Sequence, residues 1–144
     1  MEHHTKDKGD IGVAVIIADL YKKGLKVLTP MSEHLPFDIV AYDPASDDFY
    51  KVQCKYSKLS NKNTVYVKLV TSYATQHGSF SSRYKKNSFD VIATYCPEMS
   101  SVYYISSEFA DTYKSGITLR TESASNKQEV SVNYAKDFIK FPRR

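Results

Sequence analysis

The sequence of 144 residues is poor in the features that define several protein classes. It has two cysteines, Cys54 and Cys96, too few for a disulfide framework or for a closed zinc site built from thiolates. No apolar run approaches the roughly 18 residues of a membrane span. Residues 1–10 are polar and lack the apolar core of a signal peptide. These absences predict a cytoplasmic protein without a membrane partner.

Tryptophan is absent, and five glycines and five prolines are too few for a flexible linker. The hydrophobic fraction of 42% and the charged fraction of 25% are ordinary for one globular domain. Lys and Arg outnumber Asp and Glu by 20 to 16, and the net charge of +4 permits a nucleic-acid partner without requiring one. The 12 tyrosines are suited to interfaces and to phosphate contacts.

Hydrophobic periodicity predicts the secondary structure. In residues 10–23, Val13, Ile17 and Leu20 share one helical face, and Gly24 is a helix stop. Residues 71–87 are expected to form a helix or an irregular segment, and a short helix is expected from Ser106 or Ser107 to residue 113. Strands are predicted at residues 25–28, 37–42, 49–56, 65–70, 89–95, 102–105, 117–120 and 130–134. This order predicts an α/β (α+β) fold with a mixed central β-sheet flanked by helices.

A hairpin between residues 37–42 and 49–56 would bring Asp38 beside Gln53 and Lys55. Side chains alternate along a strand, so Gln53 and Lys55 share one face, and Cys54 points to the other as a small core residue. Carboxylate and amide oxygens suit Mg²⁺, and an ammonium group beside a metal ion can stabilise charge on a phosphoryl group. The same spacing is also compatible with a turn-capping Asp38 and a solvated Lys55.

Four segments of this sequence together resemble the PD-(D/E)XK nuclease superfamily. They are Lys-Gly-Asp-Ile-Gly at residues 8–12, the helical residues 17–24, Pro-Phe-Asp at 36–38, and Val-Gln-Cys-Lys-Tyr-Ser at 52–57. Within the superfamily, the sequence is most similar to the homing endonucleases encoded by cyanobacterial group I introns, and next to archaeal-type Holliday junction resolvases.

The resemblance implies a restriction-endonuclease-like core and a single nuclease domain over residues 1–144. The core is expected at about residues 8–105, with peripheral or oligomerisation elements at about 106–144.

The resemblance also implies a metal site and roles for five residues. Asp38, Gln53 and the main-chain carbonyl of Cys54 match the metal ligands, and Gln53 stands where the family usually has Asp or Glu. Lys55 matches the catalytic lysine. The expected cofactor is Mg²⁺, which Mn²⁺ or Ca²⁺ can replace in binding. Val13 stands where family members often carry a helix glutamate, either as ordinary core or as a lesion of the metal site.

Basic and hydrogen-bonding residues follow the motif and are expected to contact DNA. Lys and Arg neutralise phosphates, while Gln, His and Ser can read base edges in the major groove. A solvated polar loop is the alternative. The candidates are Lys58, Lys62, Gln76, His77, Ser79, Ser81, Arg83, Tyr84, Lys85 and Lys86.

The function predicted from these observations is a Mg²⁺-dependent, sequence-specific homing endonuclease of double-stranded DNA in a bacterial host. Activity is expected to be impaired by Val13. One active site cuts one strand, so a homodimer is the minimum, and the resemblance suggests a tetramer. The alternatives are a structure-specific junction resolvase and a non-catalytic DNA-binding module derived from a nuclease.

Overall fold

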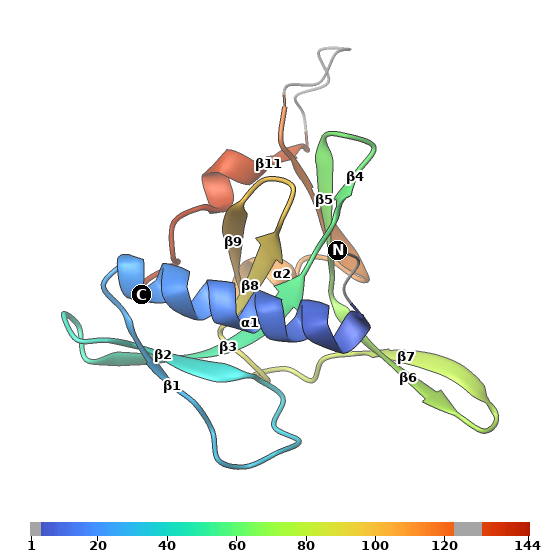
Figure 1. The fold of residues 1–144 in the computed structure, drawn as a ribbon, viewed down its shortest axis with the longest axis horizontal. Helices are drawn as coiled ribbons and strands as arrows, with labels where there is room; N and C mark the ends of the chain where they lie inside the picture. Colours follow the sequence, from blue (N-terminus) through green and yellow to red (C-terminus); the bar gives the residue numbers. More distant parts are fainter. Residues whose placement is uncertain (1–3, 123–130) are drawn as a thin grey trace.

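The computed structural model describes residues 4–122 and 131–144. Its centre is a five-stranded sheet in the order β1-β2-β3-β8-β9 (Figure 1). Strands β3 and β8 are parallel, and the other neighbouring pairs are antiparallel. The predicted mixed sheet and the hairpin of β2 and β3 are therefore confirmed. The strands span Lys26–Leu28, Ile39–Asp43, Asp48–Tyr56, Val91–Cys96 and Ser101–Ser106.

One long helix, α1 (Thr5–Lys22), lies across one face of this sheet (Figure 1). It begins earlier than the predicted start at Asp10, because the side chain of His4 accepts a hydrogen bond from the first turn and caps it. It ends as predicted, since Gly24 has a positive φ of 84° and its N–H donates to the carbonyl of Tyr21.

The buried stripe of α1 is rotated slightly from the predicted one. Gly12, Ile16 and Leu20 are buried against the sheet. Val13 and Ile17, which the sequence placed with Leu20 at the centre of the face, are partly buried beside this stripe. The stripe therefore follows the i, i+4, i+8 positions, and Val13 lies at its flank.

A second, smaller sheet covers the opposite face of the central sheet. It has the order β11-β10-β5-β4, formed by Asn133–Tyr134, Gly116–Arg120, Thr64–Lys68 and Leu59–Ser60. Its buried side chains pack with those of β8 and β9 in a second core that includes Val65, Val67, Ile92, Ile105, Ile117 and Leu119. Residue 130 of the strand predicted at 130–134 lies outside the described residues.

The remaining helical elements are single short turns. Helix α2 (Ser107–Ala110) is shorter than predicted, and the side chain of Ser106 caps it by accepting from the N–H of Phe109. The 3₁₀ turn η1 spans Ala135–Phe138. Among the described residues, no helix has the length and apolar character needed to cross a membrane.

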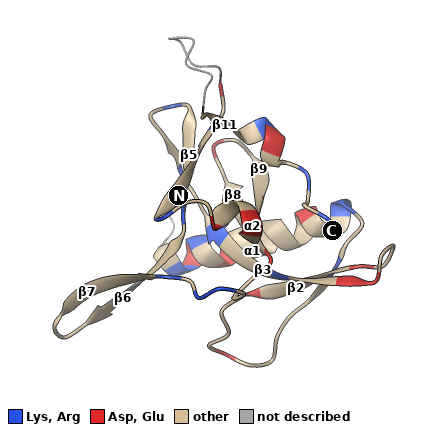
Figure 2. Cartoon of the chain, turned by 180° about the vertical axis from the view of Figure 1, so that it is seen from behind, with Lys and Arg blue, Asp and Glu red and all other residues tan. Residues whose placement is uncertain are grey.

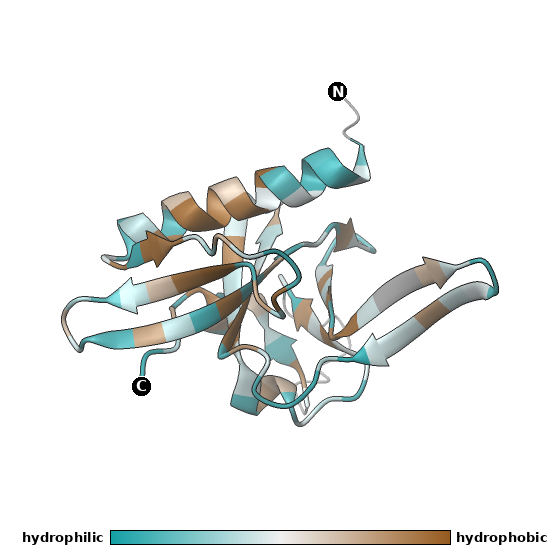
Figure 3. Cartoon of the chain, turned by 90° about the horizontal axis from the view of Figure 1, so that it is seen from below, coloured by the Kyte–Doolittle hydropathy of each residue, from teal (hydrophilic) through white to brown (hydrophobic). Residues whose placement is uncertain are grey.

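The prediction of a helix or an irregular segment at residues 71–87 is wrong. Strands β6 (Val70–Thr75) and β7 (Gly78–Arg83) form a two-stranded antiparallel ribbon that extends away from both sheets (Figures 1 and 3). Thr75 pairs with Gly78, so Gln76 and His77 form the turn, and Gly78 has a φ of 128°. This segment has too few apolar residues for a buried helical face, whereas its Thr and aromatic residues favour a strand.

Candidate active site

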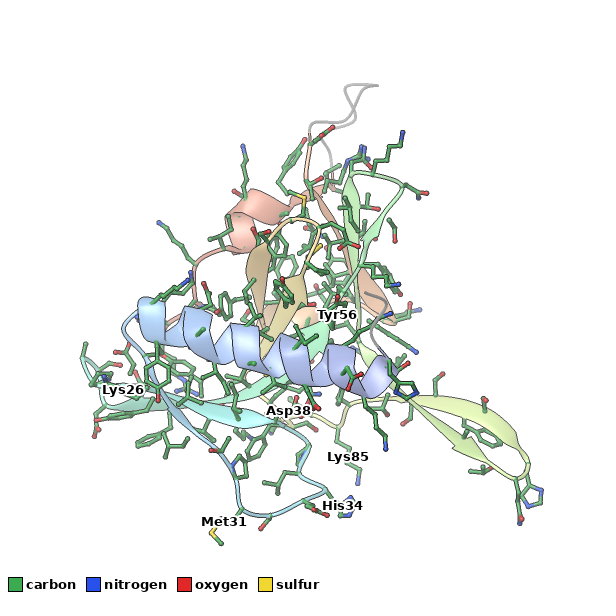
Figure 4. All side chains as sticks on the ribbon, in the orientation of Figure 1. Lys26, Met31, His34, Asp38, Tyr56 and Lys85 are labelled. Atoms are coloured by element: carbon green, nitrogen blue, oxygen red, sulfur yellow. The ribbon has the colours of Figure 1, made fainter. Side chains whose placement is uncertain are left out.

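Asp38 lies directly before β2, where β3 continues past its neighbour (Figure 4). Its N–H donates to the carbonyl of Val52 at 2.9 Å, and its Oδ2 accepts a 2.7 Å hydrogen bond from the N–H of Cys54. The residue is exposed, but its carboxylate lies against the strand backbone. Desolvation there raises the pKa of Asp38, and the bond from Cys54 and the charge of Lys55 oppose this rise. The structure thus brings Asp38 to the motif strand.

The two faces of β3 separate the core residues from the candidate site residues. Val52 and Cys54 pack in the core beneath α1. Gln53 and Lys55 point the other way, and Gln53 is in register with Ile92 of the second core. Burial raises the pKa of the Cys54 thiol, so this side chain stays protonated. The carbonyl of Cys54 shares the strand edge of its N–H, and therefore faces the Asp38 side.

The ammonium group of Lys55 is held by Tyr84. Its Nζ donates to the hydroxyl oxygen of Tyr84 at 3.1 Å and lies 5.1 Å from the centre of that ring. The ring of Tyr84 in turn packs edge-on against Phe89. Desolvation, and then repulsion from Lys68, lower the pKa of Lys55 to about 8 despite the charge of Asp38. The lysine is therefore a positioned, partly desolvated cation.

The donor set of this site fits a divalent cation that is completed by water and substrate. It offers the Asp38 carboxylate, the Gln53 amide and the Cys54 carbonyl. The described residues contain no cluster of three His, Cys, Asp or Glu side chains that could hold a metal ion. Mg²⁺ is commonly bound through one or two carboxylates plus substrate phosphates. The set therefore suits a weakly held ion better than a permanent one.

The first helix approaches this site closely. A Cβ added at Gly12 would lie 3.4 Å from the main-chain oxygen of Lys55, so the backbone of α1 rests against β3 at this lysine. Val13 is the next residue and packs at the edge of the core between α1 and the central sheet. The structure therefore places the apolar Val13 on α1 next to the residue that contacts β3, at the position where the sequence resemblance implied a carboxylate.

Six of the predicted DNA contacts lie on turns and on the ribbon. Lys58 follows β3 and Lys62 lies in the turn between β4 and β5, and both are exposed. Gln76 and His77 form the tip of the ribbon. Ser79 and Ser81 share one face of β7, since they are two residues apart on a strand.

The other four predicted contacts lie at the base of the ribbon and have different environments. Lys85 and Lys86 are exposed in the loop after β7. The guanidinium group of Arg83 donates to the carbonyl of Tyr113 at 2.6 Å, which fastens the ribbon base to the segment after α2. Tyr84 points inward to Lys55. Its role at the lysine was missed, because no local pattern signals a contact between residues 29 apart in the sequence.

Comparison with known proteins finds a matching family and a solved structure of similar fold. The family described as PD-(D/E)XK endonuclease matches residues 3–141. No curated protein sequence matches the chain. A solved structure of a bacterial homing endonuclease, I-Ssp6803I, is similar with a TM-score of 0.71 and 25% sequence identity, over 88% of this chain and 84% of that chain.

Proposed function

The chain belongs to the PD-(D/E)XK endonuclease family, and we propose that it is a divalent-metal-dependent, sequence-specific endonuclease of double-stranded DNA. The observation that carries the proposal is the junction of Asp38 and Lys55 at one end of β3. One carboxylate accepts from the N–H of Cys54, and the next residue presents an ammonium group that is fixed by Tyr84. The similarity to a bacterial homing endonuclease supports DNA as the substrate and recognition of a specific DNA sequence.

The residues of the site divide the work of phosphodiester hydrolysis. Asp38, Gln53 and the Cys54 carbonyl would hold the metal ion, which when bound polarises the phosphate and activates water. Lys55 would place its positive charge where negative charge develops on the phosphate. Tyr84 holds that ammonium group in place, so the charge needs no reorganisation during the reaction.

The ribbon of β6 and β7 would read the DNA sequence. The major groove of B-DNA admits a two-stranded β-ribbon. Residues 70–82 contain no Lys, Arg, Asp or Glu, and Figure 2 shows the ribbon uncoloured by charge along its length, with basic residues at its base. Hydroxyl and amide groups on the ribbon suit base edges, whereas Lys85 and Lys86 at the base suit phosphates.

A double-strand break requires two copies of the site. Each chain has one candidate active site, so we propose a homo-oligomer that is at least a dimer. Two ribbons from such a dimer would read two half-sites on one DNA duplex.

A cleavage screen tests the proposed function. The chain is incubated with a plasmid library in Mg²⁺ or Mn²⁺, and the new DNA ends are sequenced. We expect ends at one preferred sequence. The variant Lys55→Ala should produce no such ends while it still binds DNA and melts like the unchanged protein, because Lys55 is proposed to act chiefly on developing charge. Normal cleavage by Lys55→Ala would contradict the site assignment.

A non-catalytic DNA-binding module is the second candidate function. It is favoured by the absence of a three-ligand acidic cluster among the described residues and by Val13 at the helix-acid position. Sequence-specific DNA binding without any cleavage in either metal ion would select this candidate. Preferential cleavage of a four-way junction over a linear duplex would instead indicate a junction resolvase.

A further inference from the structure

A basic cleft opens beside the candidate active site, and Lys55 contributes to its lining. It has a volume of about 380 Å³ and lies between the end of β3 and strands β4 and β5. We call it the β3–β5 cleft. Its charged lining residues are Lys55, Lys58 and Lys68, and no Asp or Glu lines it. Such a surface is suited to an anion.

The positive charges of three lysines lie close together at this cleft. Lys68 is near enough to Lys55 for repulsion between them to be felt. Glu98 attracts Lys58 electrostatically, but its carboxylate accepts from the N–H of Leu59 and lies outside the cleft lining. An anion in the cleft would offset the repulsion. Lysine is a point-charge donor to phosphate, so a phosphate group is a fitting occupant.

Neutral hydroxyl groups complete the lining. Val65 and Val67 of β5 are fully buried in the second core, so Tyr66 and Lys68 alternate onto the outer face of that strand. The hydroxyl end of Tyr66 lies over Gly116 of β10 so closely that any Cβ there would collide with it. Glycine at this position therefore leaves room for the ring of Tyr66, a residue that also lines the cleft. Ser60 of β4 adds a second hydroxyl.

We propose that the β3–β5 cleft binds a phosphate of the DNA backbone next to the scissile phosphate, with Lys58 and Lys68 as its phosphate-binding residues. This inference rests on the proposed function. Lys55 belongs to both places, since its ammonium group donates to Tyr84 in the candidate active site and the residue also lines the cleft. A DNA strand with its scissile phosphate at Lys55 would then carry the adjacent phosphate into the cleft, and this contact would fix the register of the strand.

The salt dependence of DNA binding tests this proposal. Binding of a fluorescent mixed-sequence duplex is measured in EDTA over a series of salt concentrations, for Lys58→Gln, Lys68→Gln, the double variant and the unchanged chain. Each lost phosphate contact should reduce the slope of log K against log salt by about 0.9. The matched control is Lys26→Gln on β1, which removes the same charge at the other end of the central sheet (Figure 4). It should leave the slope unchanged.

Two outcomes would overturn the proposal for the cleft, and only the second would also overturn the proposed function. If the unchanged chain binds DNA but Lys58→Gln and Lys68→Gln keep its slope, the cleft does not touch the DNA backbone, and the proposed function stands. If the unchanged chain does not bind DNA at all, the proposed function falls together with the cleft.

A second measurement distinguishes a DNA phosphate from a free one. Inorganic phosphate is titrated into the DNA-free protein while the amide signals of residues 58–68 are followed by NMR. Shifts that Lys68→Gln removes, together with the reduced salt slope, support a backbone-phosphate site. Phosphate-induced shifts with an unchanged salt slope would make the cleft a site for free phosphate and overturn the DNA assignment.

Discussion

Lys55 and Tyr84 define the electrostatics of the site at the scale of single residues. A lysine with a pKa near 8 is still mostly protonated at neutral pH, so it retains the charge that phosphate chemistry requires. The hydroxyl of Tyr84 accepts from that ammonium group, while its ring is fixed separately by Phe89. The hydroxyl and the ring therefore have separable functions.

The variant Tyr84→Phe tests the hydroxyl alone. It removes the acceptor for Lys55 but keeps the ring that packs on Phe89. We expect kcat for DNA cleavage to fall about fivefold with KM unchanged, since one hydrogen bond is worth about 1 kcal/mol. The melting temperature should stay nearly constant. Tyr21→Phe on the exposed side of α1 is the control. A rise in KM at constant kcat would show instead that Tyr84 contacts DNA.

Val13 is the second residue whose replacement is informative. It lies at the flank of the buried stripe of α1, next to the Gly12 contact with β3. We expect Val13→Glu to strengthen Mg²⁺ binding and to increase cleavage, because a carboxylate there would add an acidic ligand to the proposed metal site. Without Mg²⁺ the partly buried charge should lower the free energy of unfolding by about 1–3 kcal/mol.

The variant Val13→Gln separates the effect of charge from that of shape, because a Gln side chain has nearly the shape of Glu without its charge. It should destabilise the protein with and without Mg²⁺ and add no activity. Calorimetric Mg²⁺ titration, melting curves and plasmid cleavage measure the three properties. If Val13→Glu behaves like Val13→Gln in Mg²⁺ affinity, stability and cleavage, Val13 is an ordinary core residue. The glutamate that the resemblance implies on the first helix then has no counterpart at this position.

At the scale of elements, the ribbon of β6 and β7 shows where sequence patterns stop being informative. The hairpin of β2 and β3 was predicted correctly, because two runs rich in apolar and aromatic residues flank an Asp-Pro turn. The strand β7 is exposed at every position, so it carries no contrast between buried and exposed side chains. Its pairing, such as Ser79 with Ala74, is set by cross-strand hydrogen bonds, and hydropathy does not report these.

The ribbon should supply specificity without salt dependence. We expect the double variant Ser79→Ala, Ser81→Ala to weaken binding to the preferred DNA sequence by about 1–3 kcal/mol per lost base contact. Binding to unrelated DNA, and the slope against salt, should not change, because no charge is removed. Ser101→Ala on β9 is the control. An equal loss on all sequences would mean that the ribbon touches only the backbone.

At the scale of the whole molecule, the layering of helix, sheet and second sheet was only partly predictable. The order of α1, β2 and β3 follows from local periods and turn residues. The second sheet depends on the pairing of Val65 with Leu119, which are far apart in the sequence. The β3–β5 cleft depends in turn on that sheet, so Lys68 and Tyr66 become neighbours of Lys55 only in the folded chain.

The end of the molecule opposite the active site is held by two arginines. The side chain of Arg143 donates to the buried Asp43 at 2.7 Å and to the carbonyl of Lys23 at 2.8 Å, which joins the end of β2 to the end of α1. Arg144 lies within 4 Å of carboxylates on both Asp48 and Asp90. Asp43 is the last residue of β2 and Asp38 precedes its first, so the contact of Arg143 with Asp43 can be altered without touching the candidate catalytic residues.

The pH dependence of stability should report the contact between Arg143 and Asp43. The hydrogen bond from Arg143, and then that from the N–H of Ala45, hold the pKa of Asp43 below its ordinary value of 3.8. A depressed carboxyl pKa adds stability above pH 3.8, and this stability is lost as the pH falls through the pKa of the folded state. Arg143→Gln should therefore melt at a lower temperature at pH 7, and its melting temperature should fall less between about pH 5 and pH 3. Lys140→Gln is the control for charge alone, and DNA cleavage below the melting range should be unchanged. Parallel melting curves for Arg143→Gln and the unchanged chain across this range would contradict the assigned contribution of Asp43.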